Sequence, residues 1–215
     1  MTTHAYLKIA GFCTSVLMTV SPILGETALA SDQFTPLPFG NARLDGRIGH
    51  QIDALIKARY TSDFAQKEIY PETAEALRQR VDDVIHNKVG LWQGEFWGKW
   101  ILGAIAAQRY TGEKELKEFI RKAVREALAT QDPSGYIGTY SKTDTTRRWN
   151  VWCMKYTLWG LVEAYELLGE PDILVAARRQ MDYLMTFVGP GKTEIASTGD
   201  FSGFPSSSIL QPLVM

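Results

Sequence analysis

The sequence predicts an all-α fold, an incomplete α/α toroid of helical hairpins. Gly103 and Gly160 lie 57 residues apart, and so do Gly112 and Gly169. A period of this size indicates stacked helical hairpins, which form either an open solenoid or a closed ring. The connections within a hairpin are tight, whereas those between hairpins (131–149 and 189–206) are long and rich in polar and aromatic residues. Long decorated loops favour the ring, because ligand-binding residues gather on such loops.

The repeat predicts four helices, at residues 95–110, 114–130, 150–168 and 172–187. Two helices are expected before them, one starting near Leu44 and one at Pro71, since proline suits a first helical turn. Another leading helix should begin at 206–208. The apolar run that ends at Met215 has no helix-stop signal, so 44–215 is interpreted as the truncated N-terminal portion of an α/α barrel.

The two kinds of helix differ in how polar residues are distributed. The helices at 114–130 and 172–187 have charged residues on one side only, which predicts that they form the outer layer. The helices at 95–110 and 150–168 are apolar nearly all round and carry Gly103 and Gly160 at matching places, where small residues allow close packing. These leading helices are therefore expected to line the inside of the ring, with their N-terminal ends on the side of the long loops.

The N-terminal 30 residues have the features of a secretory signal peptide. Lys8 precedes a mostly apolar stretch that is too short and interrupted for a good membrane span, and Ala28 and Ala30 give the small-x-small cleavage pattern. An uncleaved anchor is the alternative. We expect an exported protein, periplasmic or extracellular, with a linker at 31–43 and no membrane insertion after cleavage. Cys153 would then be the one remaining cysteine, so burial rather than a disulfide must stabilise the fold.

The composition excludes some function classes. The formal net charge is −1, from 23 basic and 24 acidic residues without a charged block, so no nucleic-acid partner is expected. The three histidines are scattered, which makes a histidine metal site improbable. Six Trp, nine Tyr and nine Phe fit either core packing or a surface that stacks on sugar rings. No feature of the sequence indicates an oligomeric state.

The starts of the leading helices and the loop before the second of them form a candidate sugar site. Tryptophan rings stack on sugars, and Asn, Glu, Lys and Ser exchange hydrogen bonds with hydroxyl groups. Core packing is the alternative for the tryptophans, and snorkelling or ion pairing for the lysines. The turn at 132–135 would place two phenols and a threonine at the mouth. The candidate binding residues are Glu95, Trp97, Lys99, Tyr136, Thr139, Tyr140, Trp149, Asn150, Trp152, Lys155 and Ser207.

Five segments, in this order, resemble glycoside hydrolase family 127, the β-L-arabinofuranosidase-like proteins of the six-hairpin glycosidase superfamily. They lie at 94–100, 110–112, 130–140, 149–156 and 206–212. The resemblance implies an incomplete (α/α)6 toroid, in which 44–215 is the truncated N-terminal portion of the α/α-barrel catalytic domain. It also implies hydrolysis of glycosidic bonds by a cysteine nucleophile beside a zinc ion, with a glutamate acid/base. No position of this sequence matches those groups: Cys153 does not match the nucleophile, and catalytic residues are expected downstream of Met215. Trp149 and Asn150 stand where the arabinofuranosidases proper have a His-Glu pair, which leaves the substrate open.

The sequence therefore predicts the N-terminal fragment of a secreted glycoside hydrolase that acts on oligo- or polysaccharides of plant type. This fragment is expected to be inactive alone and to hold no cofactor, although a full-length family member could hold zinc. Two alternatives remain: a non-catalytic carbohydrate-binding module of helical hairpins, and another α/α-toroid enzyme such as a polysaccharide lyase.

Overall fold

The computed structural model describes residues 40, 42–78, 91–141 and 145–215. The signal peptide predicted at 1–30 and most of the linker lie outside this part. Within it the chain is helical and forms no strand, apart from an isolated bridge between Val188 and Thr193. The helices are α1 (Gly46–Ile56), η1 (Lys57–Thr61), η2 (Ala65–Ile69), α2 (Tyr70–Arg78), α4 (Gly94–Thr111), α5 (Lys114–Leu128), α6 (Asn150–Leu168), α7 (Pro171–Phe187), η4 (Ile195–Ser197), η5 (Phe201–Gly203), α8 (Phe204–Ser207) and α9 (Leu210–Leu213).

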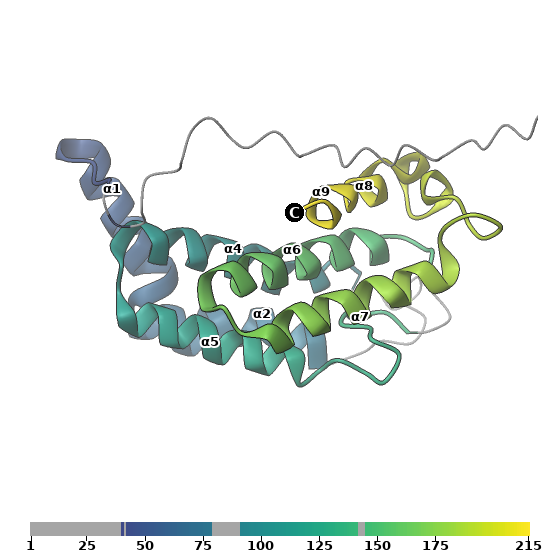
Figure 1. Cartoon of the computed structure of the whole chain (residues 1–215). Helices are drawn as coiled ribbons and strands as arrows, with labels where there is room; N and C mark the ends of the chain where they lie inside the picture. The colour runs from purple at the N-terminus through teal and green to yellow at the C-terminus, as the bar shows by residue number, and fades with distance from the viewer. Residues whose placement is uncertain (1–39, 41, 79–90, 142–144) are drawn as a thin grey trace, which may run out of the picture. The chain divides into compact units, whose positions relative to one another are not determined.

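The predicted hairpins are confirmed, α4 with α5 and α6 with α7, and Figure 1 shows them side by side. Their boundaries lie within two residues of those expected. In both hairpins the leading helix ends on a glycine in the left-handed region, Gly112 with φ 73° and Gly169 with φ 71°. The amide of each glycine donates to a carbonyl four residues back, at 2.7 Å in the first hairpin and 2.8 Å in the second. The repeat thus has a physical basis, since a glycine accommodates this cap without strain.

The leading helices α4 and α6 pack directly against each other, as expected for inner helices. Two glycines allow the approach: a Cβ atom on Gly98 would lie 2.3 Å from the Tyr156 carbonyl oxygen, and one on Gly160 would lie 2.5 Å from Ile101 Cγ2. Gly103, which the repeat aligns with Gly160, instead faces the hydroxyl of Tyr60. The close packing was predicted, but on α4 the glycine that permits it is Gly98.

The outer helices are joined by ion pairs between the hairpins. On α5, Arg121 and Arg125 both pair with Glu170, and Arg125 also pairs with Asp172 at the start of α7. These charged groups lie on the solvent side of helices whose opposite faces, including Ile120, are buried in the core. The predicted two-faced character of the trailing helices is confirmed.

Other elements differ from the expected helices. The segment at 206–208 does not open a long helix, because α8 is already complete at Ser207 and α9 spans only four residues. The helix expected at Pro71 begins one residue earlier, at Tyr70, and follows the π-helical turn η2. Among the described helices, none is both long enough and apolar enough to cross a membrane.

Candidate functional site

The N-terminal ends of α4 and α6 meet around one carboxylate. Glu95 lies in the first turn of α4 and is only 8% exposed. The Lys99 ammonium donates to its Oε1 at 2.7 Å, and the Trp152 indole N–H donates to its Oε2 from the neighbouring hairpin. Both oxygens of the carboxylate are therefore engaged, which satisfies a charge that would otherwise be costly to bury.

Two adjoining hollows open at this end of the helices. The first, of about 360 Å³, is lined by Trp92, Glu95, Lys99, Trp149 and Trp152. The second, of about 500 Å³, shares the last two tryptophans and adds Phe204, Pro205, Ser207 and Ser208. The walls thus combine flat aromatic rings with a carboxylate, an ammonium group and hydroxyl groups. Rings stack on the apolar faces of sugars, and the polar groups can exchange hydrogen bonds with sugar hydroxyls.

Four of the predicted site residues line the first hollow, and Ser207 lines the second. Five others lie in the interior, each at most 2% exposed: Trp97, Tyr136, Thr139, Tyr140 and Asn150. Side chains this deeply enclosed are placed for packing and hydrogen bonding within the protein. For Trp97 the structure supports the core-packing alternative, since its indole N–H donates to the Ala123 carbonyl oxygen at 3.3 Å.

The buried phenols hold the rim of the first hollow in place. Tyr136 donates to Asn150 Oδ1 at 2.6 Å and accepts from the Tyr140 amide at 3.0 Å. The Tyr140 hydroxyl in turn accepts from the Trp149 amide at 3.1 Å and donates to the Leu91 carbonyl oxygen. Leu91 directly precedes Trp92, so this chain of bonds fixes the backbone at two of the rim tryptophans.

Trp92 was missed by the sequence reasoning, although the repeat contains the information that identifies it. It lies 57 residues before Trp149, the same interval that separates Glu95 from Trp152. Equivalent positions of the two hairpins therefore supply two pairs of residues to the hollow. Trp92 precedes α4 and is 45% exposed, which leaves its ring available to a ligand.

The described residues do not form a zinc site. No group of three His, Cys, Asp or Glu side chains among them is placed to hold a metal ion. Cys153 is 1% exposed, and its sulfur lies 3.7 Å from the Trp92 carbonyl oxygen. Burial is the main cause that raises the pKa of its thiol well above the usual range, and the nearby Glu95 carboxylate adds to the effect. We therefore assign no nucleophilic or ligating role to Cys153.

A consequence is that Cys153 should react very slowly with thiol reagents in the folded protein. In a Cys13→Ser variant, labelling by an aromatic disulfide at mildly alkaline pH should be on the order of a hundredfold slower than in denaturant, because the thiolate is the reactive form and is disfavoured here. Absorbance of the released thiol measures the rate. Complete labelling within seconds under native conditions would contradict the buried position.

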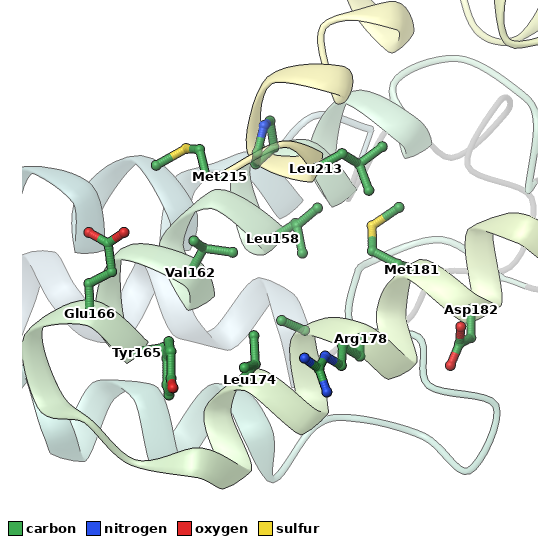
Figure 2. Close-up of a pocket in the computed structure, with 12 residues that line it drawn as sticks. Leu158, Val162, Tyr165, Glu166, Leu174, Arg178, Met181, Asp182, Leu213 and Met215 are labelled. Atoms are coloured by element: carbon green, nitrogen blue, oxygen red, sulfur yellow. The ribbon is translucent and has the colours of Figure 1, made fainter. Parts of the chain in front are cut away.

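A third hollow, of about 580 Å³, lies between α6, α7 and the C-terminal segment. Figure 2 shows Leu158, Val162, Leu174 and Met181 lining it, with Leu213 and Met215 above them. Its charged groups, Glu166, Arg178 and Asp182, come from different turns of α6 and α7 and form no ion pair with one another among the described contacts. This hollow is an apolar packing surface without the clustered polar groups of the tryptophan-lined site.

Comparison with known proteins agrees with the helical-hairpin architecture. A family model described as "Beta-L-arabinofuranosidase, GH127 catalytic domain" matches residues 46–208. A solved structure described as a GH127 β-arabinofuranosidase is similar with a TM-score of 0.55 and 18% identity over 81% of this chain. The chain spans 33% of the length of that structure. No curated protein matches the sequence. Because the family model covers most of the chain, the protein belongs to the catalytic-domain family of glycoside hydrolase family 127.

Proposed function

We propose that this chain forms one wall of the glycan-binding site of a glycoside hydrolase that acts on β-L-arabinofuranosyl groups of plant-type glycans. The observation that carries the proposal is the hollow in which Trp92, Trp149 and Trp152 surround the Glu95 carboxylate. Family membership supports the activity, and the name of the similar solved structure supports the sugar. The apolar segment with its small-x-small motif supports export across a membrane.

The proposal assigns binding rather than bond cleavage to the described residues. The family resemblance implies a cysteine nucleophile with a glutamate acid/base, and the enclosed thiol of Cys153 does not fit that role. Glycosidases of the common type instead use two carboxyl groups on either side of the scissile bond. In the tryptophan-lined hollow Glu95 is the one carboxylate among the described lining residues, and it is already held by Lys99 and Trp152. Its role in the proposal is to orient the Trp152 ring and to accept hydrogen bonds from sugar hydroxyls.

A second candidate function is a carbohydrate-binding module without hydrolytic activity. It is favoured by the same engaged carboxylate and by the enclosed thiol of Cys153. Release of the chromophore from an aryl β-L-arabinofuranoside by the purified chain would overturn this second candidate, because only a hydrolase cleaves the bond, and it would also contradict the inactivity expected of this chain. Membership of family 127 weighs against the third alternative, a polysaccharide lyase.

Removal of the Trp152 ring tests the site. Trp152→Ala should weaken binding of an arabinofuranosyl oligosaccharide at least about tenfold, equivalent to about 1.4 kcal/mol, because it removes a wall of both hollows. Isothermal titration calorimetry measures the affinity, and thermal unfolding shows whether the variant remains folded.

Two control variants sharpen this experiment. Trp152→Phe keeps an aromatic face but loses the donor to Glu95, so its affinity should fall between those of Trp152→Ala and the wild type. Phe64→Ala removes a ring that is 64% exposed and lines neither hollow, so its affinity should equal that of the wild type. Unchanged binding by a folded Trp152→Ala protein would overturn the proposed site.

A further inference from the structure

Lys155 occupies an unusual environment beside the tryptophan-lined hollow. The residue is 6% exposed, and its ammonium group lies 4.7 Å from the ring centre of Trp152, 4.6 Å from that of Tyr156 and 5.5 Å from that of Trp159. All three rings belong to its own helix, α6. Ring faces attract a cation, but they accept no conventional hydrogen bond from it.

No acceptor is paired with this ammonium group in the part of the chain that the structure describes. Lys155 Nζ is nevertheless not among the described side-chain atoms that are fully enclosed without a hydrogen bond. The nitrogen therefore keeps some contact with solvent, although the residue as a whole is only 6% exposed. A buried cation normally has a charged or polar partner, and its absence here indicates a place for one.

A second cation lies nearby. The Lys99 ammonium is 4.9 Å from the centre of the Tyr156 ring and 5.9 Å from that of Trp152, so both lysines lie against the same two rings. The Glu95 carboxylate offsets Lys99, with which it forms an ion pair. The cluster thus holds two positive charges against one negative charge.

The pKa of Lys155 agrees with this excess of positive charge. Burial is the main cause that lowers its pKa below the ordinary value for lysine, and repulsion from Lys99 lowers it further, while Glu95 acts in the opposite direction. An additional anion would stabilise the charged form of Lys155 and reduce the repulsion between the two lysines.

We propose that Lys155, together with Lys99, binds the carboxylate of an acidic sugar whose ring stacks on Trp152. The inference rests on the proposed glycan site and specifies its substrate class: a glycan that carries a uronic acid next to the neutral sugar. Trp152 connects the two parts, because it lines the hollow and also contacts both ammonium groups. Lys155 is thus a specificity-determining residue.

The test compares an oligogalacturonide with its fully methyl-esterified form, which has the same sugar chain but carries neutral methyl esters in place of the carboxylates. Calorimetry at low salt should show that the wild-type chain binds the acid at least about tenfold more tightly than the ester. High salt should reduce this preference, because charge pairing at a partly exposed site is screened. Lys155→Met keeps the length of the side chain but removes its charge, so it should bind both ligands with the affinity of the ester.

Lys114→Met is the matched control, because Lys114 is an exposed lysine at the start of α5, outside the site. It should retain the preference for the acid. If Lys155→Met does not fold, the binding of acid and ester to the wild-type chain at low and high salt decides whether the inference holds. Equal binding of the two ligands, while a neutral arabinofuranosyl oligosaccharide still binds, overturns this inference alone. Failure of every glycan to bind overturns the proposed function as well.

Discussion

Trp97→Ala is expected to lower the free energy of unfolding by about 3–5 kcal/mol, the usual cost of truncating a buried aromatic residue to alanine. Trp97 is 0% exposed, and a Cβ atom on Gly160 would lie 3.1 Å from its Cζ3 atom, so the ring fills the contact between α4 and α6. Truncation would leave a cavity at this contact and would remove the donor to the Ala123 carbonyl oxygen. A loss of this size is a large part of the about 5–15 kcal/mol by which a typical domain is stable.

Urea unfolding followed by circular dichroism measures the effect. Trp92→Ala is the matched control, because it removes the same ring from a position that is 45% exposed. We expect it to change stability by less than about 1 kcal/mol, in line with the low cost of most exposed substitutions. A Trp97→Ala protein that unfolds at the wild-type urea concentration would show that the ring is not a core element.

Gly98→Ala is expected to destabilise the protein by about 1–3 kcal/mol, the typical cost of overpacking. The added methyl group would lie 2.3 Å from the Tyr156 carbonyl oxygen and 2.4 Å from the carbonyl carbon. Because the obstacle is backbone, no change of rotamer can relieve it, and α4 and α6 must move apart. Affinity at the proposed sugar site should also fall, since Glu95 and Trp152 lie on these two helices.

Gly103→Ala provides the comparison on the same helix. Its methyl group would meet the Tyr60 hydroxyl, the far end of a side chain that can swing aside. Alanine is favoured over glycine within a helix by about 1 kcal/mol, so Gly103→Ala should be neutral or slightly stabilising. Equal thermal unfolding midpoints for the Gly98 and Gly103 variants would contradict the assigned helix contact.

Regular features of the fold could be predicted from the sequence because they follow from local physical rules. Gly112 and Gly169 mark helix ends, since a left-handed cap favours glycine wherever the hairpin lies in the molecule. The charged faces of α5 and α7 identify the outer layer, because the charged side of an amphipathic helix lies opposite the face that packs on the core. The short helices after residue 200 were not predicted, because Phe201 and Ser202 adopt positive φ values that no sequence pattern indicated.

The site was harder to predict, because a residue type does not reveal whether its side chain faces the hollow or the core. Trp97 and Trp152 are both tryptophans near the start of an inner helix, yet only Trp152 lines a hollow. Trp97 lies two residues beyond Glu95, which turns its ring by more than half a helical turn, toward α5. Trp92 lies before the helix and was overlooked for that reason, although its 57-residue relation to Trp149 marks it.

The bond between the Glu95 carboxylate and the Trp152 indole has a consequence for how ligand binding and folding are related. Glu95 belongs to one hairpin and Trp152 to the next, so the proposed binding surface lies at a contact that neither hairpin forms by itself. A saccharide that touches both sides would favour the docked pair over separated hairpins. A change that loosens the contact enough to populate separated hairpins would weaken saccharide binding in proportion to the docked fraction that is lost. In the proposed site, a sugar ligand would therefore also report whether the two neighbouring hairpins are docked.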